Sequence, residues 1–240
     1  MFPSAFTDLW LSPHTKGERL CGDGTVTVTV SPDLPENERL TVLTTTDGRT
    51  HVLITPAVRA TMGLAAGQDL DEAEFRRKVA ASGITLHGAD HLFSFTHAVR
   101  ETLLGEPDAG SVRRLTSDDA AAFAAFQSAA TEQDLEDSYV ELDHWAVFGA
   151  FEGDRLVCAG SAYPWNGAPV ADIGVLTRPA FRGQGHGRHV VRALSRHALA
   201  HGHEPQYRCQ LGNHASVALA ASVGLTAFGT WDVVASDSPV

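Results

Sequence analysis

Residues 182–187 read Arg-Gly-Gln-Gly-His-Gly, between an apolar run at 173–177 and an amphipathic stretch that begins at Arg188. This order predicts a strand, a glycine-rich turn and a helix. The first turn of a helix leaves backbone N–H groups without partners, and its dipole adds roughly half a positive charge there. Because glycine has no Cβ, a pyrophosphate can approach the backbone of such a turn closely. The segment therefore predicts an anion site.

Two familiar phosphate loops do not fit this segment. A Walker-type loop requires Gly-Lys-Ser/Thr, whereas Arg188 and His189 follow the last glycine. A dinucleotide fingerprint requires Gly-x-Gly-x-x-Gly at the start of a βαβ unit, whereas the spacing here is Gly-x-Gly-x-Gly and lies late in the chain. Taken alone, the segment also fits a tight strand-to-helix turn that binds nothing.

A second element follows, in which Asn213-His214-Ala215-Ser216 leads into an alanine-rich stretch. Together the two elements resemble motif A, Arg/Gln-x-x-Gly-x-Gly/Ala, and the Asn-x-x-Ala/Ser helix of the GCN5-related N-acetyltransferases (GNAT family). Arg182, Gly185 and Gly187 fill the fixed positions of motif A. The resemblance covers about residues 111–240.

The resemblance implies a site for acetyl-CoA as the acyl-donor substrate. In that family the strand before the loop pairs its backbone with the pantetheine arm, and the loop N–H groups hold the pyrophosphate. The matching positions in this sequence are Val175, Leu176, Thr177, Arg182, Gly183, Gln184, Gly185, His186, Gly187, Arg188, Asn213 and Ser216. The implied activity is direct transfer of an acetyl group to a primary amine of a small molecule or peptide.

Direct transfer needs a base for the attacking amine and a proton donor for the departing thiolate. Many members of the resembled family place a tyrosine donor seven residues after the motif asparagine, but that position here is Ala220. We assign the donor role to Tyr207, near the start of the next strand, and the base role to Asp172, a carboxylate inside an apolar strand. Core packing stays open for the tyrosine, and an outward orientation for the aspartate. Further base candidates in the acidic segment before that strand are Glu132, Glu136, Glu141 and His144.

Composition bounds the class of protein. The chain has 240 residues, is 43% hydrophobic and carries a formal net charge of −11, which disfavours nucleic acid as the main partner. It has no run of 18 apolar residues and no signal-peptide pattern, so we expect neither a membrane partner nor secretion. Its three cysteines lie far apart without a Cys-x-x-Cys pair, which favours a reducing cytoplasm. We expect no metal, and the sequence leaves a homodimer open.

Coenzyme A is an anion, so its site must be locally positive although the chain is acidic. Four arginines within 15 residues supply that charge: Arg178, Arg182, Arg188 and Arg192. For Arg192 a solvated helix face is the better interpretation.

The pattern predicts an α+β protein with two domains separated by a linker at 105–110. Residues 111–240 follow the order β-α-β-β-β-α-β-α-β, the GNAT order, which implies a central mixed, mostly antiparallel sheet flanked by helices. Residues 1–105 predict a smaller α+β domain, with strands at 25–30, 40–46, 51–55 and 90–99 and a helix at 69–82. This domain is either a degenerate GNAT-like copy without a glycine loop or an unrelated cap domain.

Three classes of function stay open. We favour an N-acetyltransferase that uses acetyl-CoA, because motif A is intact. A catalytically weak module that binds or senses acyl-CoA is the first alternative, since Ala220 stands where the family donor would be. A transferase for another acyl-CoA is the second.

Overall fold

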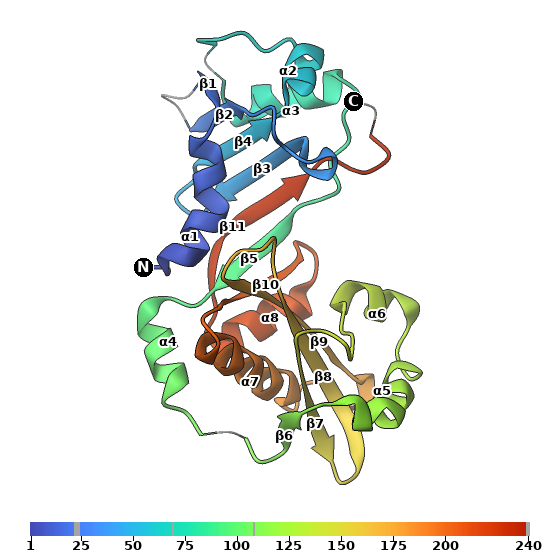
Figure 1. Ribbon diagram of the computed structural model, residues 1–240. Helices are drawn as coiled ribbons and strands as arrows, with labels where there is room; N and C mark the ends of the chain where they lie inside the picture. Colours follow the sequence, from blue (N-terminus) through green and yellow to red (C-terminus); the bar gives the residue numbers. More distant parts are fainter. Residues whose placement is uncertain (22–24, 69, 108, 239–240) are drawn as a thin grey trace. The chain divides into compact units, whose positions relative to one another are not determined.

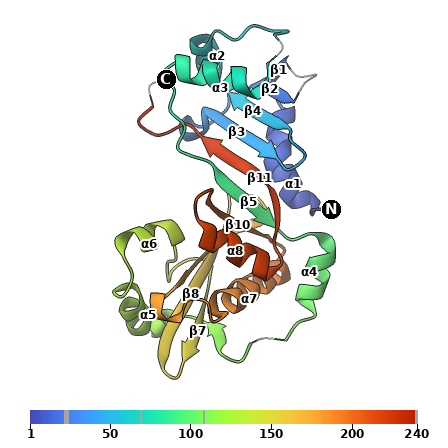
Figure 2. The same cartoon turned by 180° about the vertical axis from the view of Figure 1, so that it is seen from behind.

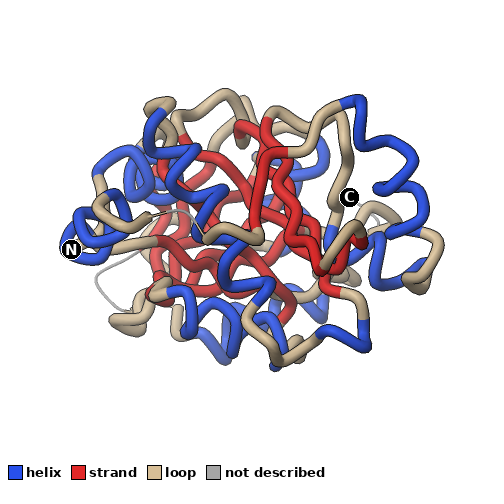
Figure 3. Tube along the Cα trace, turned by 90° about the horizontal axis from the view of Figure 1, so that it is seen from below, coloured by secondary structure: helices blue, strands red, loops and turns tan. Residues whose placement is uncertain are grey.

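The computed structural model describes residues 1–21, 25–68, 70–107 and 109–238 (Figure 1). The chain packs as two compact units, each assembled from segments that are distant in the sequence. Unit 1 contains residues 1–6, 93–208 and 213–226, and unit 2 contains residues 7–92, 209–212 and 227–240. Within each unit the helices lie outside the strands (Figure 3).

Unit 1 is built on a mixed sheet. Its strands, in order across the sheet, are β10 (Glu204–Gln210), β9 (Val170–Thr177), β8 (Arg155–Pro164), β7 (Ala146–Glu152) and β6 (Val112–Arg114). Neighbours from β6 to β9 pair antiparallel, whereas β10 pairs parallel to β9. The predicted mixed, mostly antiparallel sheet is confirmed.

Helices cover both faces of this sheet (Figures 1 and 2). They are α5 (Ala120–Gln127), α6 (Glu132–Ser138), α7 (His186–Ala200) and α8 (His214–Val223), with short 3-10 turns η3 (Ser117–Asp119) and η4 (Pro179–Phe181). A further helix, α4 (His97–Leu104), packs against α7. Side chains alternate along a strand, so neighbouring positions of β8 meet different helices. We call the face of Gly160 the α7 face, because a Cβ built there would meet Val190 and Leu194. We call the face of Gly174 the α6 face, because a Cβ there would lie 2.0 Å from the carbonyl oxygen of Ser138.

Unit 2 has its own sheet and core. Its strands, in order, are β1 (Glu18–Cys21), β2 (Val26–Val30), β4 (Thr50–Ile54), β3 (Leu40–Thr45) and β11 (Thr226–Val233). The remaining helical elements are α1 (Ser4–Leu11), η1 (Ser12–Thr15), η2 (Glu36–Glu38), α2 (Pro56–Met62) and α3 (Glu72–Ala81). Val28, Val52 and Phe75 are fully buried in its hydrophobic core. This core accounts for the strand and helix patterns of the N-terminal sequence.

The secondary structure departs from the sequence-based expectation at several elements, and α1, β1 and α2 of the N-terminal region were not predicted at all. The strand predicted over 90–99 is wrong in its second half, because β5 (Asp90–Ser94) ends early and α4 follows. The acidic segment before β7, for which no helix was predicted, contains α6, whose start is capped where the Thr131 hydroxyl accepts from Asp134 N at 3.1 Å. Threonine followed by acidic residues is an N-terminal helix signal. Because α6 is mostly exposed, it has no apolar stripe that a periodicity analysis would detect.

Two other expectations touch residues outside the described part. Asp69, the predicted first residue of the helix at 69–82, and Asp108, inside the predicted linker, lie outside the described residues. The helix itself is present as α3, and Asp71 caps it by accepting from Glu74 N at 2.7 Å. The division into domains at 105–110 stays a prediction.

Candidate functional site

Strands β9 and β10 separate at the residue pair Ile173–Tyr207. Their parallel ladder has four residue pairs and ends there. Beyond it β9 continues to Thr177 and β10 to Gln210, while β9 stays paired with β8 as far as Thr177. The outer edge of residues 174–177 therefore has no partner in the β9–β10 ladder. An extended ligand can hydrogen-bond to such an edge as a further strand would.

The glycine loop follows the open edge after the short 3-10 turn η4. Gly183 and Gly185 have φ angles of 77° and 88°, in the left-handed region that favours glycine. Gly185 is the N-cap residue of α7, and no side chain caps this 15-residue helix. The N–H groups of its first turn and the positive end of its dipole are therefore available to an anion. The predicted strand, loop and helix positions are thus contiguous in the fold.

The side chains of the loop contact the protein rather than the space above the loop. Arg182 Nε donates to the carbonyl oxygen of Thr177 at 3.1 Å, and its terminal nitrogen pairs with Asp134 at 3.1 Å. The Gln184 amide donates to the backbone of the preceding turn at 3.3 Å. The His186 ring lies 3.0 Å from a carboxylate of the β7–β8 hairpin. Any contact of Gln184 or His186 with an anion would come from the backbone.

Arg192 does not lie on a solvated helix face, so that interpretation is wrong. It is buried, and its Nε donates to Glu106 at 2.8 Å while another nitrogen donates to the carbonyl oxygen of Val223. The hydrogen bond from Arg192 holds the pKa of Glu106 below its usual range. Arg182 and Arg188 remain exposed beside the loop, and the charge of Arg182 is shared with Asp134.

The second sequence motif, which begins at Asn213, forms the start of α8. Asn213 Oδ1 accepts from the Ser216 N–H at 3.0 Å and caps the helix, while Gly224 ends it with φ 94°. Ala220, at the position of the family donor, is fully buried on this helix. Tyr207 is also buried, with its ring centroid 6.4 Å from that of Phe93. By strand alternation and its pairing with Ile173, Tyr207 lies on the α7 face.

Asp172 lies on the α6 face with both carboxylate oxygens engaged. Oδ1 accepts from the Gln206 amide at 3.0 Å, and Oδ2 accepts from Arg208 at 2.9 Å and from the Tyr163 hydroxyl at 3.2 Å. The guanidinium of Arg208 also stacks 4.0 Å from the centroid of the Trp165 ring. Burial, followed by the charge of Asp172, raises the pKa of Tyr163. The network gives Asp172 the role of an acceptor that holds Arg208, and sequence reasoning missed these donors because they come from different strands.

His144 packs onto the same face, unlike the carboxylates proposed beside it as base candidates. Its Nδ1 lies 2.8 Å from the Ser161 hydroxyl oxygen. Its ring centroid is 5.0 Å from those of Tyr139 and Tyr163. Burial lowers the pKa of His144, so the imidazole is neutral at pH 7. Glu132, Glu136 and Glu141 are exposed.

The remaining reactive side chains have structural surroundings. Cys158 and Cys209 are buried, and burial raises their pKa values to about 12 and about 11, so neither is a thiolate at neutral pH. His197, His201 and His203 pack around Trp145, with ring centroids 4.9 to 5.8 Å from it. Among the described residues no three His, Cys, Asp or Glu side chains form a group that could hold a metal ion. None of the described helices has the length and apolar character of a membrane span.

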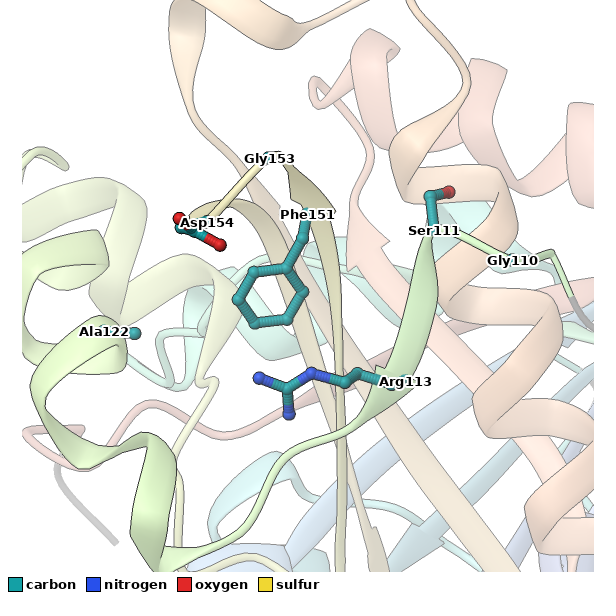
Figure 4. A pocket seen from close by; sticks show the side chains of 7 residues that line it. All are labelled: Gly110, Ser111, Arg113, Ala122, Phe151, Gly153 and Asp154. Atoms are coloured by element: carbon teal, nitrogen blue, oxygen red, sulfur yellow. The ribbon is translucent and has the colours of Figure 1, made fainter.

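A separate pocket of about 400 Å³ lies at β6 and the β7–β8 hairpin (Figure 4). Its lining residues are Gly110, Ser111, Arg113, Ala122, Phe151, Gly153 and Asp154. Arg113 lies over the Phe151 ring at 4.3 Å and pairs with Asp119 at 2.6 Å. None of the predicted site residues lines it. A narrower crevice does include Leu176, Thr177 and Arg178, at the end of the open edge.

The comparisons identify the class of the domain that holds this site. Residues 114–225 match the family model described as the acetyltransferase (GNAT) family. The fold is similar to that of a solved acetyltransferase of the GNAT family from Colwellia psychrerythraea, at 18% identity and a TM-score of 0.54. The alignment covers 77% of this chain and 76% of that one. The chain therefore carries a GNAT-type acetyltransferase domain, and the resemblance inferred from the two motifs is confirmed.

Two further solved structures align more weakly. A GNAT-family acetyltransferase from Novosphingobium aromaticivorans, named as putative, has 16% identity and a TM-score of 0.48, over 63% of this chain and 66% of its own. A conserved protein of unknown function from Staphylococcus epidermidis has 14% identity and a TM-score of 0.49, over 95% and 96% of the two chains. A search of curated proteins finds no match.

The Asp172 network predicts a stability effect. Asp172→Asn should lower the free energy of unfolding by about 2 kcal/mol, because the largely buried Arg208 loses its charged partner. Urea unfolding measures this, and the exposed Asp118→Asn is the matched control, with a change within about 0.5 kcal/mol. Unchanged stability of Asp172→Asn with a large loss of turnover would return Asp172 to the role of base.

Proposed function

We propose that the protein transfers an acetyl group from acetyl-CoA to a primary amine of a small molecule or peptide. The observation that supports this most strongly is the open edge of β9, which is followed, after the short turn η4 and the glycine loop, by an uncapped helix start. An acyl donor with an extended arm and a pyrophosphate needs these two features in this order. The bound donor would supply an activated thioester.

The residues of this chain fit such a donor. The backbone of Val175, Leu176 and Thr177 would pair with the pantetheine arm, and the N–H groups of residues 183–188 would hold the pyrophosphate. A Cβ built on Gly183 would meet no atom within 4 Å, so the backbone of the loop is open to a ligand. Asn213 and Ser216, at the start of α8, would contact the donor from the neighbouring helix.

The same geometry favours one direction for the proposed donor. If the loop holds the phosphate end, the arm runs back along β9 toward the pair Ile173–Tyr207. The unpaired part of β9, from Thr177 to Gly174, is about 10 Å long at the rise of a β-strand. The reacting thioester therefore belongs where the two strands separate.

The acceptor is proposed to be cationic. Glu132, Glu136, Glu141 and Asp143 are exposed on α6 and the segment after it, on a chain of net charge −11. Such a surface attracts a protonated amine. Bound next to the thioester, the two reactants would react as an effectively unimolecular pair.

A catalytically weak acyl-CoA-binding module is the second candidate, because Ala220 offers no donor. Thiol release after mixing the protein with acetyl-CoA and a panel of amines separates the two functions. Release with at least one amine supports the enzyme, and binding without release supports the module. A titration across acyl chain lengths tests a transferase for another acyl-CoA.

The glycine loop yields a prediction with an internal control. Gly185→Val should weaken acetyl-CoA binding at least about tenfold, because a side chain at this helix start projects where the pyrophosphate would lie. Gly202 has a similar φ of 78°, with open space around it, at the other end of α7. Gly202→Val therefore carries the same backbone strain of about 1–2 kcal/mol and should bind like the wild type. Calorimetry that finds equal affinities for the two variants would contradict the proposed pyrophosphate site.

Tyr207 is the proposed donor to the thiolate, since it lies at the closing pair on the face that also carries α7. Tyr207→Phe should lower kcat at least about tenfold while the KM for acetyl-CoA is unchanged. Urea unfolding of the same variant controls for packing. If kcat is unchanged, Tyr207 packs in the core and is not the donor.

A further inference from the structure

A chain of hydrogen bonds lies on the α6 face beside the strand opening. The Ser161 hydroxyl donates to the carbonyl oxygen of Tyr139 at 3.5 Å. The same hydroxyl oxygen lies 2.8 Å from His144 Nδ1. Ser161 is fully buried, so its hydroxyl is shielded from water, whereas His144 is half-buried.

With the Ser161 hydroxyl donating to the Tyr139 carbonyl, these hydrogen bonds favour one tautomer of the His144 imidazole. A serine hydroxyl has a single hydrogen to donate. If that hydrogen goes to the Tyr139 carbonyl, the oxygen must accept from His144, and Nδ1 carries the proton. Nε2 then holds the free lone pair. An imidazole fixed in this way can accept a proton at Nε2.

These hydrogen-bonded residues lie next to the proposed position of the thioester. Ser161 pairs with Gly174, the first residue of β9 beyond the last β9–β10 pair. The backbone of Ser138 lies so close to Gly174 that a Cβ there would be 2.0 Å from its carbonyl oxygen. His144 is therefore held beside the strand position to which the thioester is assigned.

The neighbours of His144 restrict its ring. Tyr139 ends α6 in a left-handed conformation with φ 45°, which is strained for a residue with a large side chain. Its ring and that of Tyr163 are 5.6 Å apart, and each packs against His144. The charged groups that act on the imidazole are Asp143 and Glu141, from its own segment. They raise its pKa by less than burial lowers it.

We propose that His144 is the general base for the acceptor amine and that Ser161 is the positioning residue that fixes its tautomer. This inference rests on the proposed function. His144 Nε2 takes one proton from the substrate ammonium, and the amine nitrogen forms the new C–N bond with the acetyl carbon. The C–S bond breaks, and the thiolate leaves with its electron pair. The sulfur takes its proton from Tyr207, the second proton of the nitrogen restores the Tyr207 hydroxyl, and His144 releases its proton to solvent.

The kinetic test uses three variants of the full chain and an amine that the wild type acetylates. In the wild type, kcat/KM should fall as the pH drops through the pKa of His144, which burial holds below 6.5, because the protonated imidazole cannot accept a proton. His144→Gln should lose this acid limb and at least about 100-fold in kcat. Ser161→Ala should keep the limb at a shifted pH with a smaller loss. His197→Gln, a half-buried histidine packed on Trp145, should behave like the wild type.

A spectroscopic test does not depend on turnover. Nitrogen NMR at a pH where His144 is neutral should show the ring protonated at Nδ1 in the wild type and as a mixture of tautomers in Ser161→Ala. A proton on Nε2 in the wild type would overturn the positioning role, and an acid limb that survives in His144→Gln would overturn the base. A wild type that releases no thiol with any amine would defeat the proposed function and the base with it, while the NMR result still decides the role of Ser161.

Discussion

The end of the β9–β10 ladder at Ile173–Tyr207 is the constraint on which the site depends. Backbone N–H and C=O groups need partners, and a strand that parts from its neighbour leaves a row of them for water or a ligand. Because the glycine loop and the start of α7 follow this edge, one continuous stretch of backbone offers both an extended pairing edge and an anion site. Side chains contribute little to the proposed donor site, which explains why three glycines make up most of the sequence motif that predicts it.

The separation of the strands also divides the proposed chemistry between two faces. Tyr207 belongs to the α7 face, while His144 and Ser161 belong to the α6 face. Also on the α6 face, Asp172 and Arg208 form an ion pair that is largely buried and has further hydrogen bonds to Gln206 and Tyr163. A paired and satisfied carboxylate can remain charged inside a protein. In this account the ion pair has a structural role, and the proton transfers are made by His144 and Tyr207, which are neutral.

The sequence was sufficient for features set by local chemistry. The glycine loop follows from short-range signals, and the family followed from two motifs in order. Features that depend on pairing between distant residues were not predictable. The donors to Asp172, the burial of Arg192 against Glu106 and the contact of Ser138 with Gly174 each join segments that only the fold brings together. Helix α6 was missed because its exposed, acidic sequence has no apolar stripe, although its threonine cap was visible.

Hydrogen–deuterium exchange with and without acetyl-CoA tests the central claim most directly. If the open edge and the loop bind the donor, the added ligand should protect amides at 174–177 and 183–188. The pocket of Figure 4, around 110–113 and 151–154, should exchange as before. Protection confined to that pocket, with no change at residues 174–188, would contradict the account.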